Sequence, residues 1–268
     1  MRRQERGLEG KNVLITGATS GIGRAAAISL SQANPERMLI VGRREERLQK
    51  LESELNRLYP RVKVDKLALD VRDRVAVEKK IGDYCSQYPI DLLLNNAGLA
   101  AGNAPIDQCD TDDWERMIDT NVKGLLYVTK AVTPDMIKRG KGHIINISSI
   151  AGREVYPNGN VYCATKHAVT ALTLGMRQDL VGKGIKVSQV SPGAVETEFS
   201  IVRYHGDEER ARKVYEGYTP LTAEDVAECI LFMATAPEHV NIAEIFVLPA
   251  AQGDTRIFYK TPGYTRRI

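Results

Sequence analysis

The sequence predicts an α/β fold, a single doubly wound, Rossmann-like domain with a parallel sheet and helices on both of its faces. Short apolar runs alternate along the chain with longer segments of helical periodicity, which is typical of β-α-β units. The apolar runs lack polar alternation, as expected for strands that are buried on both faces. No linker, repeat or break in composition divides residues 1–268, so we expect one domain with a core at 9–250 and a tail at 255–268.

In the first half of the chain, the apolar run Val13-Leu14-Ile15 ends at a glycine-rich turn, which indicates a buried strand. A helix is expected to follow at residues 22–32 and to stop at Asn34-Pro35. The next expected elements are a strand at 38–41, a helix at 45–58, a strand at 62–69, a helix at 73–84 and a strand at 90–94.

The second half continues with a long amphipathic helix at residues 112–138, in which Pro134 is expected to bend the last turns. Beyond Pro192-Gly193 the chain is polar, and we expect irregular structure until residue 224. The remaining expected elements are a strand at 143–147, a helix at 162–180, a strand at 186–190, a helix at 224–234 and a strand at 245–248.

Composition excludes several classes of protein. Hydrophobic residues make up 43% of the chain and the net charge is only +3, which argues against disorder and gives no support for nucleic-acid binding. No apolar stretch reaches the ~18 residues of a membrane span, and no apolar signal segment follows the basic start from Met1 to Arg6. We therefore expect a cytoplasmic protein without a membrane partner.

The cysteines are widely spaced, with no C-x-x-C pair and no accompanying histidine cluster. This pattern predicts neither a disulfide framework nor a metal site. We expect buried, reduced thiols at Cys85, Cys109, Cys163 and Cys229.

A glycine-rich turn follows the first strand and opens the first helix, and it runs from Thr16 to Gly23. Glycine permits a tight turn and a close approach of a pyrophosphate, whose charge is stabilised by the helix N-terminus. The expected dinucleotide contacts in this turn are Gly17, Ser20, Gly21, Ile22 and Gly23.

The end of the second strand indicates which dinucleotide binds. An acidic residue at this place would bond the ribose 2′-hydroxyl of NAD, but here Gly42 is followed by Arg43 and Arg44. Because a guanidinium suits a 2′-phosphate, we expect NADP as the cofactor. The alternative is a solvated helix start in which these arginines pair with Glu45 and Glu46.

Tyr162 and Lys166 are four residues apart on a predicted helix, so their side chains share one face. A phenol with a reference pKa of ~10 is a poor base, but a nearby ammonium favours the phenolate and makes the tyrosine a usable acid/base. Ser149 lies just past a predicted strand end, where open α/β sheets bind ligands.

Taken together, these residues resemble the short-chain dehydrogenase/reductase family over nearly the whole chain. The resemblance is carried by Thr16-Gly17-x-x-x-Gly21-Ile22-Gly23, Asp70-Val71, Asn95-Asn96-Ala97-Gly98, Asn121, Ser148-Ser149, Tyr162-x-x-x-Lys166 and Pro192-Gly193 with Thr197. It implies that residues 1–268 form a dinucleotide-binding catalytic domain.

By this resemblance Tyr162 is the general acid/base and Ser149 steadies the substrate oxygen. Lys166 holds the nicotinamide ribose and lowers the pKa of the tyrosine, and Asn121 positions a water in a proton relay. The remaining implied cofactor contacts are Asp70 and Val71 at the adenine, Asn96 and Gly98 at its ribose, and Val195 and Thr197 at the nicotinamide.

A closer resemblance is to the NADP-dependent 3-hydroxy acid dehydrogenases, which oxidise serine and allo-threonine and are cytosolic tetramers. It is carried by Gly42-Arg43-Arg44-x-x-x-Leu48, Asn95 to Ala100, Gly142 to Ile147 and Thr197-Glu198-Phe199-Ser200-x-Val202-Arg203. We therefore expect a homotetramer. The tail from Thr255, with Phe258, Tyr259, Tyr264 and Arg266-Arg267, either covers a subunit interface or lies loose on the surface.

Three functions remain open at this point. The first is oxidation of a 3-hydroxy acid with NADP. The second is the same chemistry on another substrate, such as a 3-oxoacyl carrier, a small ketone or a steroid-like alcohol. The third is an NADP sensor without turnover, which would not need Asn121, Ser149, Tyr162 and Lys166.

A carboxylate substrate needs a cation besides Lys166. Arg203 is the first candidate because it follows Pro192-Gly193 on the segment expected to contact substrate, and Arg153 is the competing one. The alternative for Arg203 is a surface pair with Asp207 or Glu208.

Overall fold

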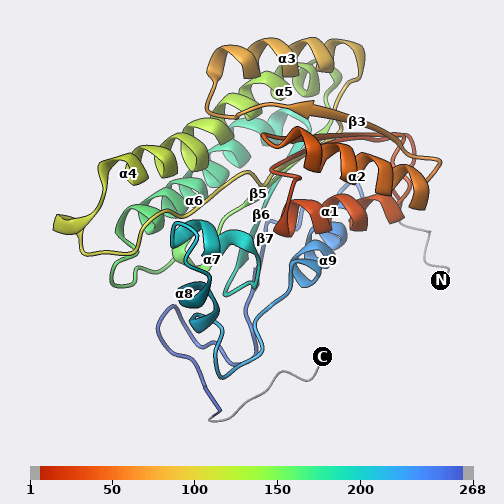
Figure 1. Cartoon of the computed structure of the whole chain (residues 1–268). Helices are drawn as coiled ribbons and strands as arrows, with labels where there is room; N and C mark the ends of the chain where they lie inside the picture. The colour runs from red at the N-terminus through yellow and green to blue at the C-terminus, as the bar shows by residue number, and fades with distance from the viewer. Residues whose placement is uncertain (1–6, 262–268) are drawn as a thin grey trace.

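A seven-stranded parallel sheet forms the centre of the molecule (Figure 1). The computed structural model describes residues 7–261. The strand order β3-β2-β1-β4-β5-β6-β7 reverses direction between β1 and β4, which makes this the switch point of a doubly wound sheet. The strands are β1 (Asn12–Thr16), β2 (Arg37–Gly42), β3 (Lys63–Ala68), β4 (Leu92–Asn95), β5 (Gly142–Ile147), β6 (Ile185–Pro192) and β7 (Glu244–Val247). The predicted fold class is confirmed.

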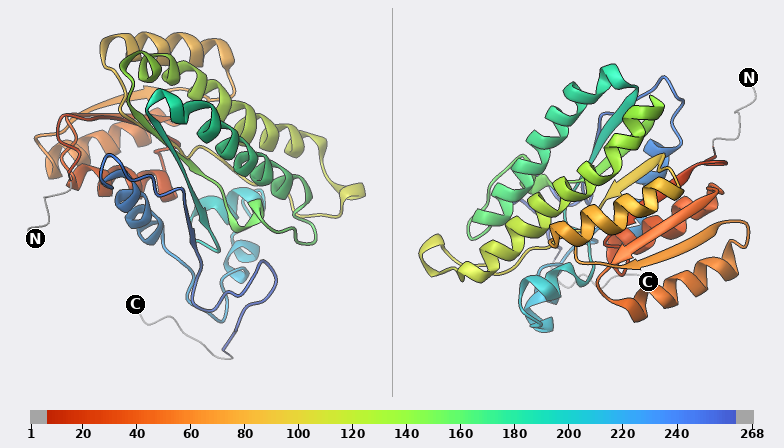
Figure 2. Two further views of the ribbon diagram at one scale, coloured as in Figure 1. Left: turned by 180° about the vertical axis from the view of Figure 1, so that it is seen from behind. Right: turned by 90° about the horizontal axis from the view of Figure 1, so that it is seen from above.

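Helices cover both faces of the sheet (Figure 2). One layer is α1 (Gly21–Gln32), α2 (Glu45–Leu58) and α9 (Ala223–Ala234), which pack with the first core cluster. The other layer is α3 (Arg74–Gln87), α5 (Leu125–Arg139) and α6 (Asn160–Leu180). Three shorter helices, α4 (Thr111–Ile118), α7 (Glu198–Arg203) and α8 (Glu208–Lys213), lie beyond the carboxyl ends of the strands (Figure 1).

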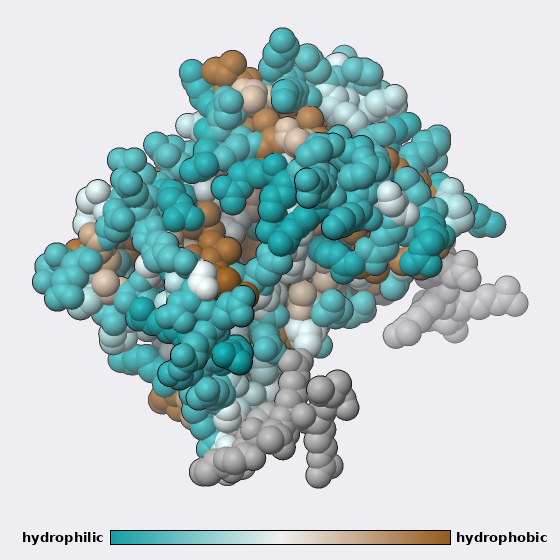
Figure 3. All heavy atoms as spheres, in the orientation of Figure 1, coloured by the Kyte–Doolittle hydropathy of each residue, from teal (hydrophilic) through white to brown (hydrophobic). Residues whose placement is uncertain are grey.

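The central strand β1 explains why the apolar runs show no polar alternation. Val13 and Ile15 pack into the cluster beneath α1 and α9, whereas Leu14 between them packs into the cluster beneath α3 and α5. All three side chains are fully buried. Because both faces are covered, every position of the strand favours an apolar residue, and each such burial contributes about 1.5–3 kcal/mol. The face of the molecule seen in Figure 3 is, by contrast, mostly hydrophilic.

The long helix expected at residues 112–138 is not uniform. It consists of α4, a π-helical turn at Asp119–Gly124 and α5, which continues through Pro134 to Arg139. The departure from α geometry therefore lies upstream of the proline. A π-helical turn inside a helix frequently marks a functional site, and this one contains Asn121.

The prediction of irregular structure between Pro192-Gly193 and residue 224 was wrong, because α7 and α8 lie there. Both are six-residue helices that begin with a side-chain cap. Thr197 accepts a hydrogen bond from the Phe199 amide, and Asp207 accepts one from the Arg210 amide. A six-residue helix is too short to show an extended apolar periodicity, so the sequence pattern did not reveal these two helices. We refer to residues 194–213 as the arm.

The described part of the tail folds back on its own chain. The Thr255 amide and hydroxyl both donate to the Glu154 carboxylate, and the Phe258 ring lies 4.9 Å from that of Tyr218. These contacts contradict a loose tail as far as residue 261. Tyr264, Arg266 and Arg267, like Met1 to Arg6, lie outside the described residues.

All four cysteines carry free thiols, but only Cys85 and Cys163 are buried. Cys109 and Cys229 are half-buried, so the prediction of buried thiols was wrong for these two. Within the described residues, no helix is both long enough and apolar enough to cross a bilayer.

Candidate active site

A groove opens at the carboxyl ends of the strands, beside the switch point between β1 and β4. Most of the expected site residues line it although they come from distant parts of the sequence. They are Gly17, Ser20, Gly21, Ile22, Arg43, Arg44, Asp70, Val71, Asn96, Gly98, Ser149, Tyr162, Lys166, Val195 and Thr197. Gly23, Asn121 and Arg203 were expected at the site too but do not line this groove.

The turn between β1 and α1 leaves the N-terminus of α1 open to an anion. Gly17 and Gly21 have positive φ angles of 68° and 51°, which a residue with a side chain rarely adopts. Ser20 stands at the N-cap without capping the helix, and the first turn of α1 carries no acidic residue. The amides at the N-terminus of α1 are therefore available to a phosphate, whereas the Ala18 amide donates to the Val41 carbonyl.

Gly23 has a different role from the other glycines. A Cβ at this position would lie 2.3 Å from the carbonyl oxygen of Gly17 and 2.4 Å from Nδ2 of Asn96. Its missing side chain therefore permits the close packing of α1 against the turn, rather than an approach of the cofactor.

Arg43 and Arg44 follow the end of β2 at the rim of the groove, and both are exposed. Arg44 donates to the hydroxyls of Thr19 (3.1 Å) and Ser20 (2.9 Å). Its ion-pair partner is Glu198 at 3.1 Å, so the alternative pairing with Glu45 or Glu46 is wrong for Arg44.

Asp70, Asn96 and Gly98 complete the walls around this part of the groove. Burial favours the neutral form of Asp70, but the Arg72 guanidinium and amide hold the pKa of its carboxyl below the usual value. Asn96 donates to the carbonyl oxygens of Thr16 and Gly17, which ties β4 to the glycine turn. A Cβ on Gly98 would lie 3.3 Å from Oδ1 of Asn121, a tight contact, and 3.5 Å from the Lys166 amine.

Ser149 and Tyr162 lie deeper in the groove. The Ser149 hydroxyl accepts a hydrogen bond from the Ala151 amide at 3.1 Å and donates to the Pro192 carbonyl at 3.4 Å. Tyr162 is 9% exposed and packs edge-on against Phe199. Burial raises the pKa of Tyr162 above its ordinary value, an effect that Ser149 and the Arg203 cation oppose.

Lys166 lies one helical turn beyond Tyr162 on α6 and points into the same groove. Its ammonium donates to the Ile147 carbonyl at 3.0 Å and lies 5.9 Å from the centre of the Tyr162 ring. Because the side chain is only 6% exposed, burial lowers the pKa of Lys166 to about 8. The predicted shared face of these two residues is confirmed.

Asn121 stands behind the groove in the π-helical turn. Its Oδ1 accepts from the Leu99 amide at 2.8 Å, and its Nδ2 donates to the Leu99 carbonyl and to the Thr165 hydroxyl. The side chain therefore fixes the loop after β4, at Leu99, against Thr165 of α6. The π-helical geometry takes the main chain around Asn121 out of the regular i to i−4 ladder.

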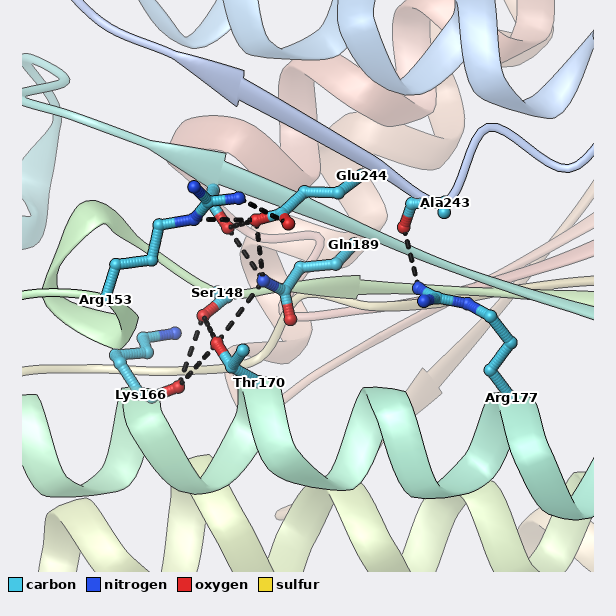
Figure 4. Close-up of polar contacts among 9 residues, drawn as sticks. Ser148, Arg153, Lys166, Thr170, Arg177, Gln189, Ala243 and Glu244 are labelled. Carbon is cyan, nitrogen blue, oxygen red and sulfur yellow. Dashed lines mark hydrogen bonds and ion pairs between the residues drawn. The ribbon is translucent and has the colours of Figure 1, made fainter.

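Arg153 belongs to a polar network with Glu244 and Gln189, close to Thr170 and Lys166 of α6 (Figure 4). Its Nε donates to Glu244 at 3.2 Å, and Glu244 also accepts from Gln189 and Ser191. Arg153 thus pairs with a carboxylate of β7 and does not line the groove. The same network reaches α6 through Thr170, which lies 3.3 Å from Nε2 of Gln189.

Arg203 lies at the end of α7 and reaches back towards Tyr162, 5.9 Å from the centre of that ring. Its guanidinium donates to the Tyr156 hydroxyl at 3.0 Å, to the Gly102 carbonyl at 3.4 Å and to Asn103 Oδ1 at 3.5 Å. All three acceptors are neutral. The alternative pairing with Asp207 or Glu208 is wrong, and this half-buried cation has no carboxylate partner among the described residues.

Several residues at the site were missed by the sequence reasoning. Tyr156 and Asn103 come from irregular loops and meet Arg203 only in the folded chain. Arg47 meets Glu198 on the arm, 151 positions further on. No local pattern signals these contacts. Among the described residues, no group of three or more His, Cys, Asp or Glu side chains is placed to hold a metal ion.

A groove at the switch point, an open helix N-terminus and a buried tyrosine-lysine pair together define a dinucleotide-dependent oxidoreductase. The family model of the short chain dehydrogenases matches residues 11–207. The chain belongs to the short-chain dehydrogenase family.

Relatives of known function match this chain over almost its full length. The chain is 47% identical over 242 residues to an NADP-dependent 3-hydroxy acid dehydrogenase of Salmonella typhi, covering 90% of this chain and 95% of that protein. The corresponding enzyme of Schizosaccharomyces pombe is 42% identical, with coverage of 94% and 98%. Sulfoacetaldehyde reductase 2 of Chromohalobacter salexigens is 47% identical, with coverage of 90% and 94%.

Among solved structures, the closed form of a serine dehydrogenase complexed with NADP+ superposes with a TM-score of 0.85. It is 42% identical, and the match covers 96% of this chain and all of that one, 100%. The serine dehydrogenase of Escherichia coli gives a TM-score of 0.76 at 40% identity, with coverage of 90% and 99%.

Proposed function

We propose that this chain is an NADP-dependent dehydrogenase that transfers a hydride between the carbinol carbon of a short 3-hydroxy acid and the cofactor. The observation that carries the proposal is Arg203, a half-buried guanidinium beside the Tyr162 ring with only neutral partners. A buried cation without a counter-charge is costly unless an anion pairs with it. The relatives named as 3-hydroxy acid and serine dehydrogenases support this choice of substrate.

The residues of the groove fit NADP. The open N-terminus of α1 suits the pyrophosphate, with the positive φ of Gly17 and Gly21 allowing the backbone to come close. Arg43 and Arg44 suit the 2′-phosphate, and β2 ends without the carboxylate that would repel it. When bound, NADP supplies the nicotinamide carbon that accepts or returns the hydride.

The protein's own groups handle the proton. Ser149 donates to the substrate oxygen in place of the Pro192 carbonyl, since its contact with Pro192 is long. Tyr162 holds its proton in the resting groove because burial raises its pKa, so it donates that proton to a substrate carbonyl during reduction. During oxidation the Lys166 ammonium stabilises the phenolate that receives the hydroxyl proton.

The remaining roles follow from position. Lys166 binds the nicotinamide ribose, and Asn121 holds a water for the proton relay through the main chain of its π-helical turn. Asp70 and Val71 contact the adenine, Asn96 and Gly98 its ribose. Val195 and Thr197 contact the nicotinamide, next to the Gly21 turn. We infer that residues 1–268 act as one catalytic domain.

A second candidate is the reduction of a short anionic aldehyde, which the similarity to a sulfoacetaldehyde reductase favours. A sulfonate and a carboxylate carry the same charge, and both match the donors of Arg203. Reduction of a 3-oxoacyl carrier or a small ketone gives Arg203 no partner. An NADP sensor without turnover gives Ser149, Tyr162 and Lys166 no role.

We infer further that the enzyme works as a homotetramer in the cytoplasm. Large apolar side chains are exposed on α5, α6, α9 and β7, including Leu126, Leu174, Phe232 and Phe246. Side chains of this kind on neighbouring elements are typical of interfaces between subunits. Light scattering coupled to size exclusion should give about four times the 29.7 kDa mass of the chain.

A substrate panel tests the function. Purified protein with NADP should oxidise serine, allo-threonine or 3-hydroxybutyrate faster than an uncharged alcohol of the same size, and with NADPH it should reduce short anionic aldehydes. A preference for uncharged alcohols would contradict the acid-binding role of Arg203. Tight binding of NADPH without turnover of any substrate would favour the sensor.

A further inference from the structure

The rim of the cofactor groove carries a contact that the proposed function does not use. Glu198, in the first turn of α7, faces two arginines from the start of α2. Arg44 lies 3.1 Å from Oε2 of Glu198, and Arg47 donates to both carboxylate oxygens at 2.6 and 2.8 Å. The two arginines hold the pKa of the Glu198 carboxyl below its usual value against the opposing effect of burial. The carboxylate therefore bridges the arm and the β2-α2 corner at neutral pH.

This bridge lies above the glycine turn. Arg44 also donates to the hydroxyls of Thr19 and Ser20, which belong to that turn, and Glu198 lines the groove with it. On the other side, the side chain of Thr197 lies 3.4 Å from the position of a Cβ on Gly21. The contact between Arg44 and Glu198 therefore lies at the edge of the groove that a dinucleotide would enter when its phosphates bind the α1 amides.

We propose that Glu198 and Arg47 are positioning residues that strap the arm across the cofactor groove and set the rates at which NADP enters and leaves. Arg44 would turn towards the 2′-phosphate when the cofactor binds, because it has further donors. Arg47 does not line the groove, so it keeps Glu198 in place and offsets the repulsion between this carboxylate and the phosphate. This inference rests on the proposed use of NADP.

A strap acts on rates more than on affinity. Opening the bridge is required in both directions, so weakening it speeds entry and exit together. All three side chains are 42–43% exposed, and exposed pairs are weak individually. We therefore expect about a 3–10-fold change for the whole bridge, reduced at high salt.

The test uses the full chain with the substitutions Glu198→Gln and Arg47→Gln. Glutamine keeps the size of the glutamate and removes its charge. Stopped-flow fluorescence of NADPH should show association and dissociation rates that both rise about 3–10-fold, with a Kd within about threefold of the original. The double variant should behave like Glu198→Gln alone, because loss of the carboxylate already removes its pairs with both Arg47 and Arg44, whereas Arg47→Gln alone leaves the pair with Arg44. Glu54→Gln is the matched control, since Glu54 pairs with Arg24 away from the groove at similar exposure.

Amide hydrogen exchange of the cofactor-free protein gives a second readout. Residues 198–206 should exchange faster in Glu198→Gln than in the original chain, and the difference should disappear in 1 M salt, where screening extends over only ~3 Å. Unchanged exchange and unchanged rates would overturn the strap. A Kd that tightens through the association rate alone would overturn it too, since Glu198 would then only repel the phosphate. If the original chain bound no NADPH, the proposed function would fail, whereas the exchange experiment would still decide whether Glu198 fastens the arm.

Discussion

Two regions meet at the groove: the side formed by β5 and α6 with Ser149, Tyr162 and Lys166, together with Asn121 behind it, which we call the wall, and the arm that carries Arg203. Different contacts hold the two regions in place. On the wall, Lys166 donates to the main chain of β5, and Asn121 bonds both main-chain groups of Leu99. Tyr162, Lys166 and Asn121 are all at most 9% exposed. These bonds are shielded from water, so the chemical groups are held before any ligand arrives.

The arm is held by side chains at its surface. Glu198 meets its arginines in half-exposed pairs, and Arg203 bonds neutral groups of loops at 3.0–3.5 Å. Contacts of this kind are weak and are exchanged readily for contacts with a ligand. We infer that the rigid wall carries out the reaction, while the arm selects the substrate and controls the passage of the cofactor.

The largest effect is expected on the wall. Tyr162→Phe removes the proton route but keeps the ring that packs against Phe199. Turnover should fall ~100-fold or more, the range of general acid–base catalysis, whereas the Kd of NADPH should change by less than about threefold. Steady-state kinetics and fluorescence titration measure the two quantities. Turnover near the original rate would show that Tyr162 does not transfer the proton, and it would contradict the assignment of the reaction to the wall.

On the arm, Arg203→Ala should act through substrate charge. A hydrogen bond to a charged group contributes about 1.5–3 kcal/mol, so KM for serine or another 3-hydroxy acid should rise ~10-fold or more. The KM of an uncharged alcohol should hardly change, although Tyr156 and Asn103 lose a partner. An equal loss for charged and uncharged substrates would show that Arg203 only supports the arm, and Arg203→Lys should then restore little.

The difference between the two regions also explains how much the sequence could predict. The wall lies on regular elements, so the spacing of Tyr162 and Lys166 and the strand end before Ser149 placed them correctly. The parallel sheet follows from the alternating apolar runs, and a ligand site at the strand ends follows from that architecture, whereas the strand order comes from the structure alone. These features depend on local periodicity and on general rules for parallel sheets.

The arm could be predicted only in part. Its six-residue helices begin at single caps, Thr197 and Asp207, which are weak signals without apolar periodicity. Arg203 lies 5.9 Å from the centre of the Tyr162 ring, but its partners lie 47 to 101 positions away along the chain, and no sequence pattern pointed to them. The commitment of Arg153 to Glu244, 91 positions away, was invisible for the same reason.

A third prediction concerns the corner where the arm meets the cofactor. Arg43 lines the groove but, unlike Arg44, it does not take part in the bridge to Glu198. Arg43→Leu should therefore reduce the preference for NADP over NAD in kcat/KM about tenfold, the lower end of a charge-assisted hydrogen bond. In this variant the dissociation rate of NADPH should rise because binding is weaker, whereas the association rate should stay unchanged because the bridge between Glu198 and its arginines is intact. Equal use of both cofactors by the original chain would contradict the assignment of this corner to the 2′-phosphate.

The smallest expected effect is a gain in stability from the wall. The pKa of Lys166 is lowered by burial from 10.5 to about 8, so the folded protein binds fewer protons than the unfolded chain between these values. Its stability therefore rises with pH across this window, and at pH 7 the buried ammonium costs about 3 kcal/mol. Lys166→Met removes this cost, and it also removes the hydrogen bond to Ile147, which offsets part of the gain.

The cofactor-free Lys166→Met protein should consequently melt about 3–6 °C higher at pH 7, from a net gain of about 1–2 kcal/mol, although it loses turnover. The gain should shrink as the pH is raised from 8 towards 10.5, because the original chain then releases the proton as well. Scanning calorimetry at several pH values measures both effects, with Lys80→Met on the exposed face of α3 as the control. A lower Tm at pH 7 would mean that the lysine stabilises the empty wall. Burial of the Lys166 ammonium would then cost no stability, contrary to the expectation that a site arranged for function lowers the stability of the fold.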